Sequence, residues 1–127
     1  MRTAGIIAEF NPFHNGHLYI IETIKNTVAD SVIAVMSGSF VQRGGPAVTD
    51  KWTRARAALD AGADLVLELP VVYSMNTAQR FSRGAVEILN ACGIVDVLAF
   101  GSESGDTARL LRAARLIPDE PPEVSRW

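Results

Sequence analysis

The chain has 127 residues, enough for one compact domain but not for two. Its 12 basic and 14 acidic residues leave a net charge near −2, so nucleic-acid binding would need a local basic patch or another domain. The single cysteine, Cys92, excludes a disulfide within the chain, and it lies in a helical pattern where a small packing residue is favoured over a nucleophile. The first apolar run is short and interrupted by polar residues, so we expect a cytoplasmic protein without a membrane segment.

Four short apolar runs begin about 30 residues apart, the length of one strand-helix unit. They read AGIIAEF from Ala4, VIAVMS from Val32, DLVLEL from Asp64 and VDVLAF from Val95. Loop residues follow each run: NPFHNG, GSFVQRGG, PVVYSMN and GSESG. Strands that are apolar throughout and separated in this way are typical of a parallel sheet covered on both faces. The predicted fold class is therefore α/β, with a Rossmann-like doubly wound parallel sheet.

Helical patterns occupy the intervals between these runs. The first has apolar residues at three- and four-residue steps, at Leu18, Ile21, Ile24 and Val28. The second runs through KWTRARAALDA, with Thr49 or Asp50 as its cap and Gly62 as its stop. The third extends from Ala78 to Cys92 before Gly93, and DTARLLRAARLI is the fourth. We therefore predict one domain over residues 1–117, while the proline-rich residues 118–127 are either a tail or the truncated start of a C-terminal part.

The topology of such a sheet predicts which loops meet. Ligands bind beyond the carboxyl ends of the strands, where the strand order reverses. Right-handed crossovers in the usual order place the first and fourth strands side by side at that point. The loop with His14 and His17 is then a neighbour of the loop that begins at Phe100. Neither G-x-x-x-x-G-K-[ST] nor G-x-G-x-x-G after the first strand occurs, which disfavours a P-loop protein and a dinucleotide oxidoreductase.

Both histidines of the chain lie in the tetrad His14-Asn15-Gly16-His17, between a strand and a helix. A helix N-terminus favours an anion, and two imidazoles three residues apart can converge on one phosphate and stabilise the charge that develops on it. Gly16 lacks a Cβ, so a base or sugar can approach the backbone. The alternative readings are a helix start with two histidines near each other by chance, and a zinc site, for which two histidines and one cysteine supply too few ligands.

H-x-G-H after a first strand resembles the signature of the nucleotidyltransferase superfamily related to class I aminoacyl-tRNA synthetases. The wider pattern resembles the tRNA(Met) cytidine acetate ligase family, a match that covers about Gly5 to Glu103 through GIIAEFNPFHNGH, MSGSFVQRGGPAVTDKWTRARAAL, GADLVLELP and FGSE. The resemblance implies an enzyme of the HUP-type nucleotidyltransferase fold. Its substrates would be ATP, with Mg²⁺ as the accompanying ion, and acetate. It would form acetyl-adenylate and acetylate N4 of the wobble cytidine in elongator tRNA(Met).

The resemblance also implies site residues. His14 and His17 would be catalytic, at the phosphates of ATP. The ATP-binding residues would be Ile7, Ala8, Glu9, Phe10, Asn11, Pro12, Phe13, His14, Asn15, Gly16, His17, Leu18, Tyr19, Ile20 and Gly101.

Several other polar residues are weaker candidates. Arg43, Lys51 and Arg54 are candidates for phosphate or acetate contacts, against the alternative of a solvated loop or helix face. Candidates for Mg²⁺ ligation or for support of its ligands are Glu9, Asp50, Glu68 and Glu103, but magnesium is often held mainly by phosphates and waters, so we assign no protein metal ligand. Phe40 and Trp52 are either partner-facing or core residues.

Members of the family extend far beyond this length, and nothing after Gly105 resembles a second phosphate-binding motif. We therefore expect an N-terminal part of a longer protein, with most tRNA contacts outside it. Two other hypotheses stay open: a generic H-x-G-H nucleotidyltransferase that makes a nucleotide-activated small molecule, and a catalytically incomplete nucleotide-binding module. No pattern bears on oligomeric state.

Overall fold

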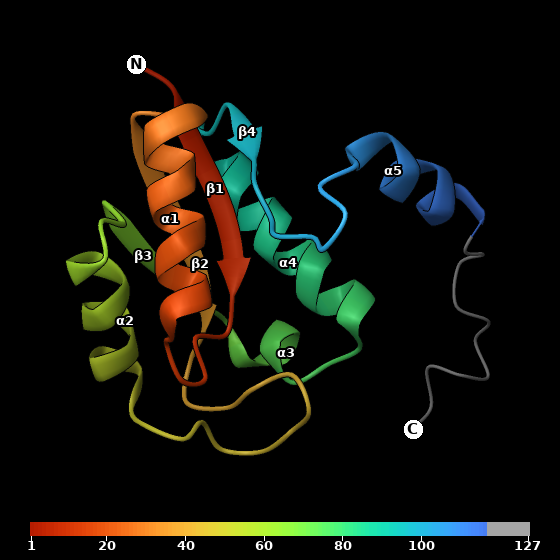
Figure 1. Cartoon of the computed structure of the whole chain (residues 1–127). Helices are drawn as coiled ribbons and strands as arrows, with labels where there is room; N and C mark the ends of the chain where they lie inside the picture. Colours follow the sequence, from red (N-terminus) through yellow and green to blue (C-terminus); the bar gives the residue numbers. More distant parts are fainter. Residues whose placement is uncertain (117–127) are drawn as a thin grey trace.

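A computed structural model describes residues 1–116 and contains a four-stranded parallel sheet of order β3-β2-β1-β4 (Figure 1). In chain order the elements are β1 (Thr3–Ala8), α1 (Asn15–Thr27), β2 (Ser31–Ser37), α2 (Lys51–Asp60), β3 (Leu65–Leu69), α3 (Val71–Ser74), α4 (Ala78–Ala91), β4 (Val97–Leu98) and α5 (Thr107–Leu116). The predicted α/β fold is confirmed. The predicted tail at residues 118–127 lies outside the described residues, as does Ile117.

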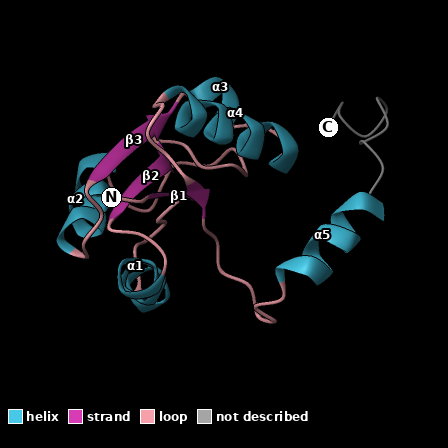
Figure 2. Ribbon diagram, turned by 90° about the horizontal axis from the view of Figure 1, so that it is seen from above, coloured by secondary structure: helices cyan, strands magenta, loops and turns pink. Residues whose placement is uncertain are grey.

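Helices cover both faces of the sheet, because side chains of the strands alternate between two apolar cores (Figure 2). On one face Ala4 and Ile6 of β1 pack with Ile21 and Ile24 of α1, and Ala58 of α2 joins the same core. On the other face α4 covers the sheet with a second core, which contains Ile33, Val35, Leu69, Ala85 and Leu89. This burial on both faces explains why the strands read as continuous apolar runs.

The predicted contact between the first and fourth strands is confirmed. In the parallel register Ala4 lies opposite Val97 and Gly5 opposite Leu98. The crossover from β3 to β4 passes over β2 and β1 through α3 and α4, so the strand order reverses beside β1 (Figure 1). The loops after β1 and β4 therefore begin at neighbouring strand ends. This edge of the sheet is where a ligand is expected.

Two local predictions need correction. The segment PVVYSMN was predicted to be a loop, but it contains α3, which packs on α4 where Gly84 leaves room for the ring of Tyr73. An added Cβ at Gly84 would lie 2.5 Å from Cγ of that ring. The fourth strand has two residues instead of the six of its apolar run, because the carboxylate of Asp96 accepts a hydrogen bond from the Thr3 amide at 2.7 Å and the chain leaves the sheet after Leu98.

The predicted helix ends are close to the observed ones. Asp50, one of the two candidate caps, caps α2. The carboxylate of Asp50 accepts hydrogen bonds from the Thr53 amide at 2.9 Å and from the Thr53 hydroxyl at 2.6 Å. Gly62 and Gly93 lie just beyond α2 and α4 with φ of 105° and 68°, a conformation that favours glycine. Among the described residues no helix is long and apolar enough to cross a membrane.

Candidate active site

The turn from β1 to α1 is held in an unusual backbone conformation. Phe10 has a φ of 48°, in the left-handed region that bulky residues rarely adopt, and its side chain is almost fully buried. Its ring packs against Phe13 at 5.2 Å between centroids and meets the imidazole of His17 edge-on at 5.0 Å. This aromatic contact anchors the first turn of α1 to the end of β1.

The two histidines form a reciprocal cap at the N-terminus of α1. His14 is the N-cap residue, and its Nδ1 accepts a hydrogen bond from the amide of Gly16 at 3.1 Å. In return, Nδ1 of His17 accepts from the amide of His14 at 3.2 Å. This is a capping box in which imidazole nitrogens accept the two hydrogen bonds that hydroxyl and carboxylate oxygens usually accept. The rings stack with centroids 3.8 Å apart.

Gly16 has a role within this cap. A Cβ added there would lie 2.9 Å from Cε1 and 3.1 Å from Nδ1 of His14. A side chain would therefore push the imidazole away from the amide that it caps. We predicted that the missing Cβ serves the approach of a base or sugar, but in the structure it first makes room for His14.

The cap also assigns the tautomers. Both Nδ1 atoms act as acceptors, so each neutral imidazole carries its proton on Nε2. Burial lowers the pKa of His17, and the nearby charge of His14 lowers it further. His17 is therefore neutral at pH 7 and presents an Nε2–H donor. The pair offers two hydrogen-bond donors at a helix N-terminus, where partial positive charge favours an anion.

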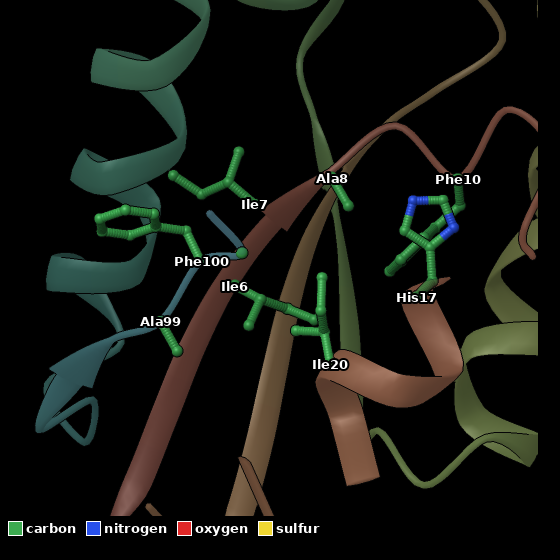
Figure 3. Close-up of a pocket in the computed structure, with 9 residues that line it drawn as sticks. Ile6, Ile7, Ala8, Phe10, His17, Ile20, Ala99 and Phe100 are labelled. Atoms are coloured by element: carbon green, nitrogen blue, oxygen red, sulfur yellow. The ribbon is translucent and has the colours of Figure 1, made fainter. Parts of the chain in front are cut away.

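Two hollows meet at His17. The apolar pocket has a volume of about 270 Å³ and is lined by Ile6, Ile7, Ala8, Phe10, His17, Ile20, Ala99, Phe100 and Gly101. Figure 3 shows Phe10 and His17 on the α1 side of β1 and Phe100 on the side of β4. The polar pocket has a volume of about 400 Å³ and is lined by Glu9, Phe10, Asn11, Pro12, His14, His17, Val41 and Arg43. Phe10 and His17 line both pockets, so they stand at the junction between them.

The polar pocket has two walls. The first wall, residues 9–17, follows β1, and the second wall, residues 38–49, follows β2. Side chains of the first wall accept hydrogen bonds from the second: Glu9 Oε2 from the amide of Gln42 at 2.9 Å, and Asn11 Oδ1 from the amide of Val48 at 2.7 Å. Glu9 and Asn11 were predicted to bind ATP. In the structure their side chains join the two walls of the polar pocket.

The three candidate cations occupy different surroundings. Arg43 is exposed, lines the polar pocket and has no ion pair within the described part of the chain. Lys51 pairs with Glu68 at 2.6 Å between Nζ and Oε2. Arg54 is 1% exposed, and its guanidinium donates to backbone carbonyls. Arg43 is thus the best placed of the three for a ligand in the polar pocket.

The candidate magnesium residues do not converge. Asp50 caps α2, Glu68 pairs with Lys51, and Glu103 is exposed in the loop after β4. Of the four, Glu9 alone lines the polar pocket. Residues 1–116 contain no group of three His, Cys, Asp or Glu side chains that could hold a metal ion by themselves.

Most of the predicted ATP-binding residues gather around these pockets. Those that line one or both are Ile7, Ala8, Glu9, Phe10, Asn11, Pro12, His14, His17, Ile20 and Gly101. The remaining five lie in the same turn and helix but line neither pocket: Phe13, Asn15, Gly16, Leu18 and Tyr19. Four further residues line the pockets but were not among the predicted site residues: Ile6, Val41, Ala99 and Phe100. Strand alternation offered a signal for Ile6, and proximity to Gly101 offered one for Ala99 and Phe100.

A parallel α/β sheet with this histidine pair at its switch point defines a nucleotidyltransferase, and comparison with known proteins supports that class. The family model described as HIGH Nucleotidyl Transferase matches residues 1–127. The chain belongs to this family, which also confirms the expected nucleotidyltransferase fold.

Within the family, the chain is similar to proteins named tRNA(Met) cytidine acetate ligase. It is 54% identical to the one from Caldanaerobacter subterraneus subsp. tengcongensis, over 99% of this chain and 32% of the relative. It is 56% identical to that of Thermoanaerobacter sp., over 95% of this chain and 30% of the relative. The chain therefore spans about a third of the length of the curated relatives it matches.

Solved structures agree. The crystal structure of Thermotoga maritima TmcAL bound with alpha-thio ATP superposes with a TM-score of 0.86 at 52% identity, over 91% of this chain and 28% of that one. A lipopolysaccharide core biosynthesis protein from Thermoplasma volcanium shares the fold alone, with a TM-score of 0.55 at 17% identity over 90% of this chain and 85% of that one.

Proposed function

We propose that the chain is the ATP-binding part of a cytoplasmic ATP-dependent ligase that acetylates the wobble cytidine of elongator tRNA(Met). The observation that carries the proposal is the stacked pair of His14 and His17 at the N-terminus of α1, with both rings lining the polar pocket and His17 also lining the apolar one. The names of the relatives and the nucleotide held by the Thermotoga maritima protein support the choice of substrates.

The two pockets suggest how ATP would lie. The apolar pocket suits adenosine, because Ile6, Ile20 and Gly101 are among its mostly apolar lining residues beside β1. The polar pocket suits the phosphates, since His14, Arg43 and the helix N-terminus face it. His17 stands at the junction, so the α-phosphate would lie against its Nε2. This placement puts both imidazole donors at the phosphorus that reacts.

The first reaction then needs little from the protein beyond placement and charge stabilisation. A carboxylate oxygen of acetate attacks the α-phosphorus, the bond to the bridging oxygen of the β-phosphate breaks, and acetyl-adenylate and pyrophosphate form. Negative charge on the α-phosphoryl oxygens would be met by the Nε2–H groups of His14 and His17. Arg43 would meet charge on the departing pyrophosphate or on acetate. In the second step N4 of the cytidine attacks the acetyl carbon, AMP leaves, and N4 loses a proton.

Mg²⁺ fits this site as an ion carried by ATP. Residues 1–116 supply no three-ligand cage, and Glu9 is the carboxylate that lines the polar pocket. Glu9 Oε2 is engaged with Gln42, which leaves Oε1 for the ion or one of its waters. When bound, Mg²⁺ would neutralise charge on the triphosphate.

Calorimetry with ATP and acetate-dependent exchange of labelled pyrophosphate into ATP test the proposal on the protein at its full natural length. We expect His14→Ala and His17→Ala to weaken ATP binding about tenfold or more and to abolish exchange, because each removes one donor to the phosphates. Asn26→Ala, at an exposed position of the same helix, is the matched control and should leave both measurements unchanged. Unchanged ATP affinity in both histidine variants would refute the site.

A second candidate is a nucleotidyltransferase that joins the nucleotide to another small acid or phosphate ester. The family description, which names no acceptor, leaves room for it. Pyrophosphate exchange that depends on such an acceptor and not on acetate would select this candidate. Binding of ATP without exchange under any acceptor would instead indicate a nucleotide-binding module.

A further inference from the structure

Arg54 is a buried cation without a carboxylate partner. Its side chain is 1% exposed, and within the described residues no carboxylate lies within 4 Å of its guanidinium nitrogens. Burial lowers its pKa, and the more distant charges of Asp50, Glu9 and Glu68 partly offset this, so the group stays charged. A buried charge of this kind persists only where dense hydrogen bonding replaces water.

Backbone carbonyls provide that hydrogen bonding. Nη1 donates to the carbonyl of Glu9 at 2.7 Å and to that of Ser37 at 3.0 Å. Nη2 donates to the carbonyl of Gly38, and Nε donates to that of Thr49 at 3.2 Å. These contacts use four of the five N–H groups of the guanidinium. Thus Arg54, predicted as a candidate phosphate or acetate contact, is directed into the protein.

Three of the four acceptors belong to the walls of the polar pocket, and the fourth, Ser37, is the last residue of β2. Glu9 opens the first wall, while Gly38 and Thr49 lie at the two ends of the second. Nη1 joins the end of β1 to the end of β2, since it bridges the carbonyls of Glu9 and Ser37. The bonds from Gln42 to Glu9 and from Val48 to Asn11 join the same walls nearer the surface. Arg54 therefore joins the two walls from the buried side without lining the polar pocket itself.

The planar guanidinium group of Arg54 makes this set of hydrogen bonds possible. A guanidinium presents its donors in fixed directions, whereas an ammonium is a compact point charge on a flexible stem. Lysine at this position would keep the charge but would not reach acceptors on both walls with the same geometry. Asp50 caps α2 one helical turn before Arg54, and this start of the helix places Arg54 beneath the ends of the strands.

We propose that Arg54 is a positioning residue that sets the separation of the two walls of the polar pocket, and thereby the place where the phosphates meet His14 and Arg43. The assignment of the ligand rests on the proposed function, while the positioning itself is a property of the protein without ligand. Two consequences follow. Arg54 acts on the phosphate end of the nucleotide and not on the adenosine end, and it acts through geometry as well as through charge.

The first test compares ATP with adenosine. In Arg54→Lys the two walls would no longer hold His14 and Arg43 in place for the phosphates. We therefore expect ATP affinity to fall about tenfold, while adenosine affinity changes less than about twofold. Arg56→Lys, at an exposed position two residues later on the same helix, should change neither. A purely structural role would lower the melting temperature and affect both ligands alike. Equal losses for the two ligands, or unchanged ATP affinity, would overturn the proposal.

The second test needs no ligand. Because His14 and His17 are the two histidines of the chain, its imidazole NMR signals all come from this pair. Arg54→Lys should shift both signals relative to wild type, and Arg56→Lys should shift neither. Unmoved signals in a folded variant would overturn the proposal. If wild type binds no nucleotide, the proposed function fails, and this measurement still decides the positioning role.

A third measurement uses the unmodified protein and so remains decisive if Arg54→Lys does not fold. In protein labelled with ¹⁵N-arginine, pyrophosphate or ATP should perturb the guanidinium signals of Arg54, because the walls that it joins enclose the ligand. The signal of Arg56 should stay in place. Saturating ATP with no change at Arg54 would contradict the proposal.

Discussion

His14 and His17 each perform two tasks with one ring. Nδ1 caps the first turn of α1, which leaves Nε2 as the ring nitrogen that can donate. The cap therefore decides the tautomer, and the tautomer decides which atom is offered to an anion. Replacement by asparagine or glutamine would keep some capping ability but would change the reach and direction of the donor.

The depressed pKa of His17 predicts a pH dependence of folding. Burial and the charge of His14 both disfavour the imidazolium in the folded state, so the unfolded chain binds more protons just below pH 6.5. The free energy of unfolding should therefore rise with pH through this window and level off above it. Urea denaturation between pH 5 and about pH 8 measures the slope. His17→Gln should flatten it, and an unchanged slope in that variant would assign the effect to other groups.

Gly16→Ala separates the histidine geometry from stability. Alanine is a better helix former than glycine by about 1 kcal/mol, and displacement of the His14 cap costs about as much, so stability should change little. The new Cβ would lie within 3 Å of the His14 ring, which must move, and we expect ATP affinity to fall about tenfold. Calorimetry and urea denaturation on the same samples check both parts. Asn26→Ala, at an exposed position further along the same helix, is the control and should leave ATP affinity unchanged.

Among the elements, α2 connects helix capping to the site. Its N-cap, Asp50, hydrogen-bonds the amide and hydroxyl of Thr53, which lower the pKa of the carboxyl below its usual value. The same first turn carries Arg54 into the interior beneath the strand ends. A disturbance at an exposed cap can therefore reach the polar pocket.

Asp50→Ala should lower the urea midpoint without changing the m-value, because it leaves amides at the start of α2 without a partner. Asp50→Asn should retain most of the stability, since asparagine caps almost as well. In wild type the contribution of the charged form is lost as the pH falls through the pKa of Asp50, which its hydrogen bonds to Thr53 hold below the usual value for aspartate. Urea denaturation of wild type and both variants at pH 7 checks that stability falls from wild type through Asp50→Asn to Asp50→Ala. Equal midpoints for Asp50→Ala and wild type would contradict this order.

At the scale of the whole molecule, the sheet brings distant segments to one edge. β1 lies between β2 and β4, so the loop with the histidines adjoins both the 38–49 loop and the loop at Gly101. The packing here is close: a Cβ at Gly101 would come within 3.0 Å of Cδ1 of Ile20. The apolar pocket thus depends on strand order as much as on any one loop.

Ligand binding at this edge should stabilise the entire domain. A ligand that binds the folded state alone adds about 2.7 kcal/mol at a concentration one hundred times its Kd. Saturating ATP should therefore raise the melting temperature by several degrees. The shift should vanish in the double variant His14→Ala/His17→Ala and persist in Asn26→Ala. An equal shift in the double variant would place the nucleotide elsewhere.

Much of the fold was predictable because its signals are local. Four apolar runs and the helical spacing between them indicated the parallel sheet, and a known chirality rule placed the first strand beside the fourth. The short β4 and the helix α3 were not predictable, since they depend on Asp96 meeting Thr3 and on Tyr73 meeting Gly84, contacts between segments apart in the chain.

Residue types and their spacing along the chain predict the kind of site: two histidines on either side of a glycine, at a strand-to-helix turn, in a chain whose motifs resemble one family. The contacts of the individual side chains, by contrast, depend on segments that only folding brings together. Folding turned Arg54 inward, paired Lys51 with Glu68, left Arg43 at the polar pocket and made Gly16 the space for His14. The physical reason is that residue type limits the chemistry available, whereas burial and the partners brought by other strands choose among its uses.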